Sequence, residues 1–170
     1  MFDAISKTFK NIIGSKADRD IKEVMPMVEK IKAIYPTLAS ISNDELRAKT
    51  LAFKAKIQDY IADDQKKVDE LKLSAETNEN IEEKERAYEE IDAIVEAMDD
   101  KIEEVLEEIL PEAFAVVKET ARRFAENKKL EVTASEMDKD IAASRDSVEV
   151  HGDKAVWYNE WNAAGAEIKW

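Results

Sequence analysis

Apolar residues recur at alternating steps of three and four positions over residues 81–109, which places them along one side of a long α-helix. The series lasts about four heptads, and charged residues flank it on both sides. A narrow apolar stripe between charged flanks is typical of helices that pair as a coiled coil. Its members are Ile81, Tyr88, Ile91, Val95, Met98, Ile102, Val105 and Ile109, with Lys84 as the one polar residue in the series.

The partner of this helix is expected immediately before it in the chain. Ser42 and Glu45 have the spacing of a capping box, so a helix is predicted from Asn43 to about Leu73. The polar stretch 74–80 is the expected turn. We therefore predict a long antiparallel helical hairpin at about residues 43–109. The apolar residues of the first helix that would face the second are Ile57, Ile61, Val68 and Leu71.

The scarcity of glycine and proline, three of each in 170 residues, favours long helices throughout the chain. We predict a mostly α fold that consists of N-terminal helices, the hairpin, a further core helix and a small C-terminal β-hairpin. The absence of cysteine excludes disulfides and thiolate metal sites within this sequence. No apolar run approaches the roughly 18 residues that a membrane-spanning helix needs.

Charge is distributed unevenly along the chain. Residues 1–56 contain eleven Lys and Arg against seven Asp and Glu, a net charge of +4, whereas residues 57–112 contain six against twenty-one, a net charge of −15. The first segment can approach an anionic surface, and the second would be repelled by one. The total of −13 disfavours nucleic acid as a partner, because that affinity comes largely from neutralising phosphates.

Residues 1–14 are the best candidate for a binding element. They are expected to form an amphipathic helix that ends at Gly14, with Lys7 and Lys10 beside its apolar face. Such a helix can lie in a membrane interface or dock on a protein core, and the pattern alone favours the core. A second helix is expected from about Asp18 to Ile34, with a kink or break at Pro26. The apolar face of the first helix consists of Phe2, Ile5, Phe9, Ile12 and Ile13.

The C-terminal part of the chain changes from long helices to shorter elements. A fifth helix is predicted from Leu110, with Pro111 in its first turn, to about residue 127. Ser135 is expected to cap a short helix that ends near Ala143. Residues 148–157 are predicted to form a β-hairpin around Gly152, and residues 167–170 can add a third strand. The expected buried face of the fifth helix comprises Phe114, Val117, Ala121 and Phe124.

No catalytic, cofactor or metal site is predicted from the residues themselves. A phosphate-binding loop needs clustered glycines, whereas Gly14, Gly152 and Gly165 stand apart. His151 is the only histidine, so a zinc site with two histidines is excluded in this sequence. The acidic pairs at 103–104 and 107–108 lack the histidine that accompanies di-metal carboxylate centres and are expected to be solvated. Residues 138–149 match a calcium loop only in part, because the turn glycine is missing.

Three stretches of the sequence resemble one known family. FKNIIGSKADRDI (residues 9–21), SNDELRAKTLAFKAKI (42–57) and LPEAFAVVKETARRF (110–124) resemble, in this order, the beginning of SecA, the ATPase motor of bacterial protein export. The likeness covers most of residues 1–57 and 107–127. Residues 58–107 and 128–170 look like insertions into shorter links of typical members.

The resemblance implies a function for the whole protein and a division of labour within it. A SecA motor binds ATP and magnesium, hydrolyses ATP and moves unfolded preproteins through the SecY channel, and it works in the cytoplasm as a peripheral protein on the inner face of the membrane. Residues 1–14 would then contact acidic phospholipids and the channel, through Phe2, Ile5, Lys7, Phe9, Lys10, Ile12 and Ile13.

The resemblance also implies what this piece of the motor lacks. The chain ends before the adenine-binding and phosphate-binding motifs, so it is expected to be the N-terminal part of a truncated first nucleotide-binding domain, without ATP hydrolysis of its own. Its expected units are residues 1–14, the helical region 15–127 and the region 128–170. The helix at 110–127 would pack against the rest of that domain, and without this partner it could drive formation of a homo-oligomer.

An alternative function follows from the hairpin alone. An acidic helical hairpin could act as a free-standing adaptor that binds a basic protein partner through the 81–109 stripe or its acidic flanks.

Overall fold

The computed structural model describes residues 16–163 and 165–169 of the chain, except the side chains of 161–163. The predicted helix at residues 1–14 lies outside the described residues. The fold is mostly α with a small β region, as the sequence predicts. In chain order its elements are α2 (Lys16–Ile34), η1 (Tyr35–Leu38), α3 (Asn43–Thr77), α4 (Ile81–Glu126), β1 (Lys129–Thr133), α5 (Glu136–Ala142), β2 (Val148–His151), β3 (Lys154–Tyr158), β4 (Glu160–Ala163) and β5 (Ala166–Lys169).

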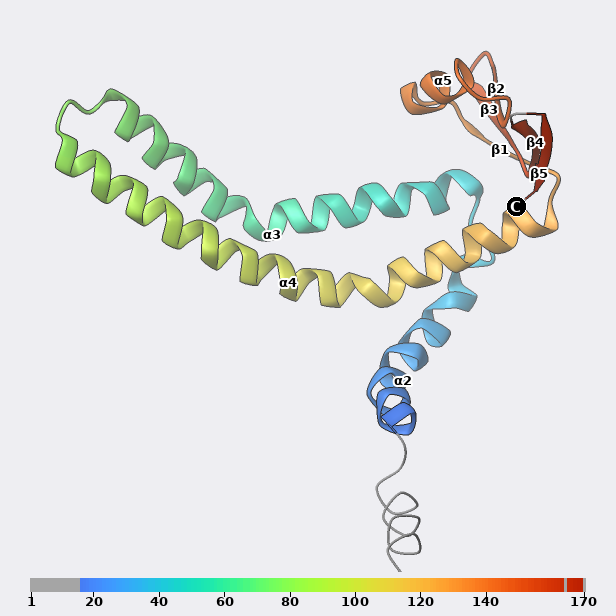
Figure 1. Cartoon of the computed structure of the whole chain (residues 1–170), viewed down its shortest axis with the longest axis horizontal. Coiled ribbons are helices and arrows are strands. Elements are labelled where there is room, and N and C mark those ends of the chain that lie inside the picture. Colours follow the sequence, from blue (N-terminus) through green and yellow to red (C-terminus); the bar gives the residue numbers. More distant parts are fainter. Residues whose placement is uncertain (1–15, 164, 170) are drawn as a thin grey trace, which may run out of the picture.

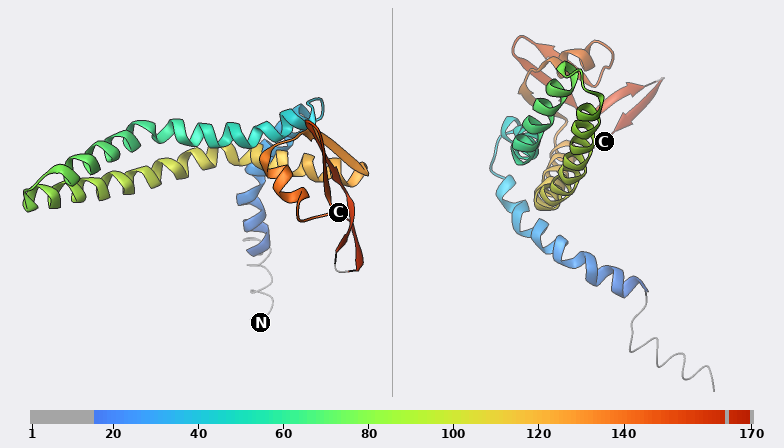
Figure 2. Two further views of the ribbon diagram at one scale, coloured as in Figure 1. Left: turned by 90° about the horizontal axis from the view of Figure 1, so that it is seen from above. Right: turned by 90° about the vertical axis from the view of Figure 1, so that its left-hand side faces the viewer.

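Helices α3 and α4 form the predicted antiparallel hairpin, which projects as a long arm from the rest of the molecule (Figures 1 and 2). Ser42 begins α3 with a reciprocal capping box: the Glu45 N–H donates to Ser42 Oγ over 3.1 Å, and the Ser42 N–H donates to Glu45 Oε2 over 2.7 Å. Asn80 caps α4 by accepting a hydrogen bond from the Glu82 N–H. The turn is shorter than predicted because α3 continues to Thr77.

The packed seam of the hairpin differs in part from the predicted stripe. Ile91, Met98 and Val105 are buried at steps of seven, and Ile61 and Val68 are buried opposite them on α3. Ile94, and not its neighbour Val95, provides the contact between these buried layers, while Ile81, Tyr88 and Val95 are exposed. Adjacent helical residues point about 100° apart, so the position of α3 decides which of two apolar neighbours is buried.

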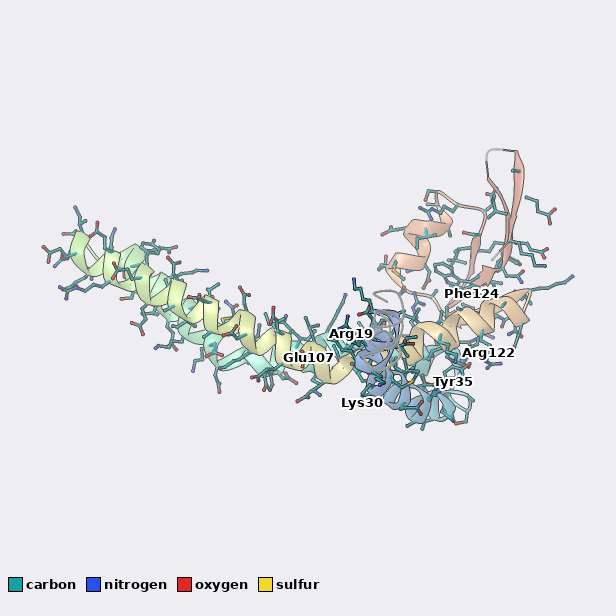
Figure 3. The ribbon with its side chains drawn as sticks, turned by 60° about the horizontal axis from the view of Figure 1, so that its bottom comes forward. Arg19, Lys30, Tyr35, Glu107, Arg122 and Phe124 are labelled. Atoms are coloured by element: carbon teal, nitrogen blue, oxygen red, sulfur yellow. The ribbon has the colours of Figure 1, made fainter. Side chains whose placement is uncertain are left out.

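A second apolar core lies at the base of the hairpin. Here the C-terminal half of α2 and η1 pack against α4. Helix α2 continues through Pro26, so the chain does not break at this proline. Figure 3 shows Tyr35 and Arg122 where η1 meets α4, and Lys118 Nζ lies 4.4 Å from the centroid of the Tyr35 ring. The buried members of this core are Leu38, Leu46, Ala115 and Val116.

Helix α4 runs through Pro111 without ending, so the predicted fifth helix is the second half of a single helix of 46 residues. A proline inside a helix removes one backbone hydrogen bond and costs about 3 kcal/mol. The Pro111 ring is buried, and its packing at the base of the hairpin offsets part of this cost.

The predicted buried face of this second half is wrong for Phe114, Val117 and Ala121, whereas Phe124 is half-buried. Phe114 and Val117 are 53% and 66% exposed. The buried residues of this half are Pro111, Ala115, Val116, Glu119 and Arg123, most of them about one turn apart. Helices α3 and η1 contact α4 on the side of these buried residues. The large apolar residues Phe114 and Val117 lie on the opposite side of the helix and are therefore exposed.

The β region contains the predicted hairpin and two strands that the sequence analysis missed, β1 and β4. Val148 pairs with Trp157 and Val150 with Ala155, and Gly152 takes a left-handed conformation (φ 65°) in the turn. Strand β1 pairs antiparallel with β3, which gives a three-stranded sheet in the order β1-β3-β2. The predicted third strand at 167–170 is largely β5, and it pairs with β4 in a separate two-stranded sheet.

The residues assigned to the seam predict different losses of stability when isoleucine is replaced by alanine at two positions of α4. Ile91→Ala removes a buried side chain and should lower the free energy of unfolding by about 2–5 kcal/mol. Ile81→Ala removes an exposed side chain of the same helix and should change it by less than about 0.5 kcal/mol. Urea unfolding followed by far-ultraviolet circular dichroism measures both. Similar losses for the two variants would contradict the seam described above.

Candidate functional site

The residues proposed from the sequence as a docking face lie at positions 2–13, outside the described residues, so the structure does not test them. Within the described residues, the densest group of buried charged side chains lies at the base of the hairpin. There α3, α4 and the β region meet, around Glu119, Arg123 and Asp138.

Arg123 joins α4 to the segment that leads into α3. Its Nη1 donates to Asn43 Oδ1 over 2.8 Å, and its Nη2 donates to the carbonyl oxygens of Leu38 and Ile41 over 2.9 and 2.8 Å. Its Nε donates to Glu119 Oε1 over 2.9 Å. The guanidinium is thus almost completely removed from solvent with all three of its nitrogens bonded, and it determines where α3 begins relative to α4.

Glu119 is the carboxylate that balances this arginine. Its side chain is fully buried and also accepts two hydrogen bonds from Arg122, over 2.9 and 2.7 Å. The two hydrogen bonds from Arg122, with the one from Arg123, outweigh the cost of burial and lower the pKa of Glu119 to about 2. The group is therefore ionised at neutral pH and serves as an acceptor, not as a proton donor.

Asp138 plays the corresponding role between α3 and the β region. Its Oδ1 accepts hydrogen bonds from Arg47 Nη2 over 2.8 Å and Trp157 Nε1 over 3.0 Å, and its Oδ2 accepts two from Ser135. Burial alone would raise the pKa of Asp138, but the hydrogen bonds from Ser135, Arg47 and Trp157 outweigh it, and the pKa is lowered. The residue considered above for a calcium loop thus has both oxygens engaged by protein donors.

The outer edge of β1 is covered by the first turns of α3. Asn43 Nδ2 donates to the Glu131 carbonyl oxygen over 3.1 Å, and Arg47 Nη1 donates to that of Thr133 over 3.3 Å. The Thr133 N–H donates to Asp44 Oδ1 over 2.8 Å. These bonds occupy backbone groups that an exposed edge strand would offer to another chain. They also attach the β region to the hairpin.

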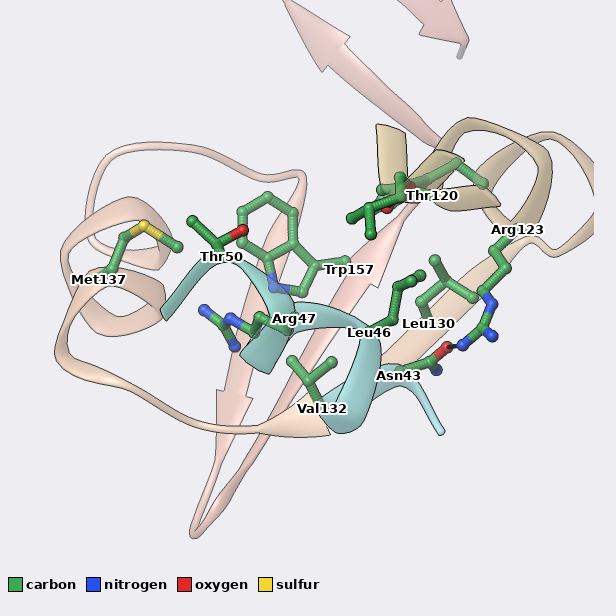
Figure 4. Close-up of a pocket in the computed structure, with 12 residues that line it drawn as sticks. Asn43, Leu46, Arg47, Thr50, Thr120, Arg123, Leu130, Val132, Met137 and Trp157 are labelled. Carbon is green, nitrogen blue, oxygen red and sulfur yellow. Dashed lines mark hydrogen bonds between the residues drawn. The ribbon is translucent and has the colours of Figure 1, made fainter. Parts of the chain in front are cut away.

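An apolar cavity of about 250 Å³ lies between these polar contacts (Figure 4). Leu46, Val132 and Trp157 form part of its walls, and the Phe124 and Trp157 rings meet edge to face with their centroids 6.5 Å apart. Arg47 and Arg123 also line it, but their guanidinium groups bond to protein acceptors. The described residues that line the cavity include no histidine or carboxylate, so it suits an apolar group and not acid–base chemistry.

Two further features concern metals and membranes. In residues 16–163 and 165–169, no cluster of three or more His, Asp or Glu side chains is arranged to hold a metal ion. Glu104 and Glu108, from the acidic pairs noted in the sequence, instead interact with Tyr60 Oη over 3.0 Å and Lys56 Nζ over 2.5 Å. No helix in the same described part is both long and apolar enough to cross a bilayer.

Comparison with known proteins assigns the family. Residues 9–135 match the model of the SecA DEAD-like domain. The chain belongs to the SecA family. It is 50% identical over 159 residues to the protein translocase subunit SecA of Parabacteroides distasonis and 48% identical over 160 residues to that of Phocaeicola vulgatus. With the subunit of Flavobacterium psychrophilum the identity is 42% over 166 residues.

These alignments cover 94% to 98% of this chain but only 14% to 15% of the relatives. The chain therefore spans about one seventh of the length of the SecA proteins that it matches. Since nearly all of the chain is aligned, these relatives share most of the hairpin and the β region, the two parts that look like insertions. No solved structure matches the chain.

The buried charged network was not found from the sequence, although a signal exists. Ala115, Glu119 and Arg123 follow one another at steps of four, which places a carboxylate and a guanidinium on one side of α4 next to an alanine. A helix face that alternates small and charged residues suits a buried ion pair as well as a solvated surface. The partners Leu38, Ile41 and Asn43 are about 80 residues away and carry no matching pattern.

Loss of the Asp138 carboxylate should separate the β region from α3. Asp138→Ala removes the acceptor of the Trp157 indole N–H and the ion-pair partner of Arg47, and it should lower the free energy of unfolding by about 1–3 kcal/mol. Asp140→Ala, an exposed position on the same short helix, should be nearly neutral. Urea unfolding followed by tryptophan fluorescence reports the difference, and an Asp138 variant as stable as the Asp140 control would disprove the role of this carboxylate.

The lowered pKa of Glu119 predicts acid sensitivity. A carboxyl group whose pKa falls on folding stabilises the native state above its unfolded pKa, about 4.5, and that contribution is lost as the pH falls toward the folded value of about 2. The free energy of unfolding, measured at pH values between about 4.5 and 2, should therefore fall as the pH is lowered. Glu119→Gln should remove part of this slope, whereas Glu96→Gln, at an exposed position, should preserve it.

Proposed function

We propose that this chain is the N-terminal portion of an ATP-driven SecA translocase and that it serves as the docking and scaffolding part of that motor. The observation that carries the proposal is the match of 94% of the chain, at 50% identity, to a protein translocase subunit SecA. The remaining six sevenths of such a protein would bind ATP and magnesium, hydrolyse ATP and move unfolded preproteins through the SecY channel.

Within this motor, residues 1–14 would contact acidic phospholipids and the channel from the cytoplasmic side. The apolar series from Phe2 to Ile13 with Lys7 and Lys10 beside it suits the interface of an anionic membrane. The first 56 residues carry a net positive charge, whereas the hairpin carries most of the negative charge. An anionic membrane would therefore attract the N-terminal end and repel the hairpin arm.

The second half of α4 offers a surface for the rest of the motor. Leu110, Phe114 and Val117 are exposed along one side of this helix, opposite the side that packs on α3 and η1. Ile21 and Val24 of α2 are exposed as well. Exposed apolar rows of this kind mark surfaces that another protein part covers. We assign them to the following nucleotide-binding domain of the same polypeptide.

The membrane assignment is tested by two substitutions in the full-length protein. Phe9→Asp places a charge in the proposed apolar face and should weaken co-flotation with anionic phosphatidylglycerol vesicles by about tenfold, because a charge in the interface opposes the burial of that face. Asn11→Asp adds the same charge on the opposite side of the predicted helix and should have a much smaller effect. Equal binding of the wild type and the Phe9 variant would remove residues 1–14 from the docking role.

A further inference from the structure

Helix α4 carries a second apolar row beside its buried seam. Ile81, Tyr88 and Val95 are spaced by seven residues and are 71%, 49% and 42% exposed. Leu106 continues the row toward the base of the hairpin and is 44% exposed. Residues at these steps lie on one face of a helix, and this face borders the seam, because Val95 lies four residues after Ile91 and three before Met98.

Acidic residues alternate with this row. Glu85, Asp92 and Asp99 each lie four residues after one of its apolar members, so they stand on the same face. In the described part of the chain, none of these three carboxylates has a hydrogen bond or an ion pair with another residue. We call the face that these acidic residues form with Ile81, Tyr88, Val95 and Leu106 the acidic–apolar face.

The opposite flank of the seam differs in this respect. There Glu90 pairs with Lys67 Nζ over 2.6 Å, Glu104 accepts a hydrogen bond from Tyr60, and Glu108 pairs with Lys56. The hairpin therefore supplies partners to the carboxylates of one flank and leaves those of the other without one. Residues 81–110 hold thirteen acidic side chains against three basic ones, so the acidic–apolar face lies in a strongly negative field.

The outer part of this face is remote from the other described elements of the molecule. The outer part of the hairpin projects away from α2 and the β region, so α3 is its only described neighbour (Figure 1). The stretch from Ile81 to Leu106 is about 38 Å long at 1.5 Å per residue. That length accommodates a helical partner of about seven turns.

We propose that the acidic–apolar face binds an amphipathic helix that carries Lys or Arg beside an apolar stripe. Apolar residues at helical spacing on the partner would cover Tyr88 and Val95, and its basic side chains would neutralise Glu85, Asp92 and Asp99. A second copy of the same face is disfavoured because like charges would meet, and an anionic membrane or a nucleic acid would be repelled. The inference is independent of ATP hydrolysis and of membrane docking.

The experiment measures binding of a fluorescent helical peptide of Leu and Lys, about 21 residues long, to the full-length protein by anisotropy. The double variant Tyr88→Glu with Val95→Glu should bind at least about tenfold more weakly, because it removes apolar contact and adds negative charge to an already negative face. Ala97→Glu adds a charge on the opposite, exposed flank of the same helix and serves as the matched control. Its affinity should stay within about twofold of the wild type.

A charge exchange separates this site from any other peptide site on the protein. Asp92→Lys with Asp99→Lys should weaken binding of the Leu/Lys peptide and create binding of a Leu/Glu peptide that the wild type does not bind. The proposal would be overturned if this variant did not bind the Leu/Glu peptide. It would also be overturned if Ala97→Glu lost as much affinity for the Leu/Lys peptide as the Tyr88 and Val95 double variant. A molecular mass of the full-length protein that rises with its own concentration, and does not rise in the Tyr88 and Val95 variant, would also overturn the proposal. The occupant of the face would then be a second copy of the protein.

Discussion

The buried guanidinium of Arg123 is the interaction on which the arrangement of the described chain depends. It bonds to the Glu119 carboxylate, to the side chain of Asn43 and to two carbonyl oxygens, one at the end of η1 and one in the segment between η1 and α3. A buried charge is tolerated only when it is paired and its donors are satisfied, so few other positions of that segment are compatible with this network. The start of α3, and with it the direction of the hairpin arm, is therefore tied to the second half of α4.

The same turns of α3 also position the β region. Asn43 bonds to Arg123 through its oxygen and to the edge of β1 through its nitrogen, so one side chain links the two parts. Arg47 repeats this arrangement one turn later, with bonds to the Thr133 carbonyl oxygen and to the buried Asp138. The region between these polar bridges is apolar and lines the cavity. Because each bridge satisfies buried donors, the β region depends on α3 for its attachment and not only on its own small sheets.

Two kinds of surface remain after this packing, and they suggest different partners. The row on the second half of α4 and the first half of α2 is apolar and lies near the base of the hairpin. The acidic–apolar face lies on the projecting arm and carries unpaired carboxylates between its apolar members. The first suits the interior of a larger fold, and the second suits a partner that brings positive charge.

The sequence by itself determined the elements whose signals are local. The heptad alternation predicted the hairpin, the spacings Ser42–Glu45 and Ser135–Asp138 cap helices, and Gly152 with its flanking valines predicted the β2–β3 pair. Tertiary structure decided whatever depends on a neighbour distant in sequence. In the packed hairpin, Ile94 and not Val95 contacts the buried seam. Glu119 and Arg123 are buried on the second half of α4, whereas Phe114 and Val117 are exposed, and β1 pairs with β3. Periodicity shows that a helix has an apolar side, but only the partner that packs against it selects which residues lose contact with water.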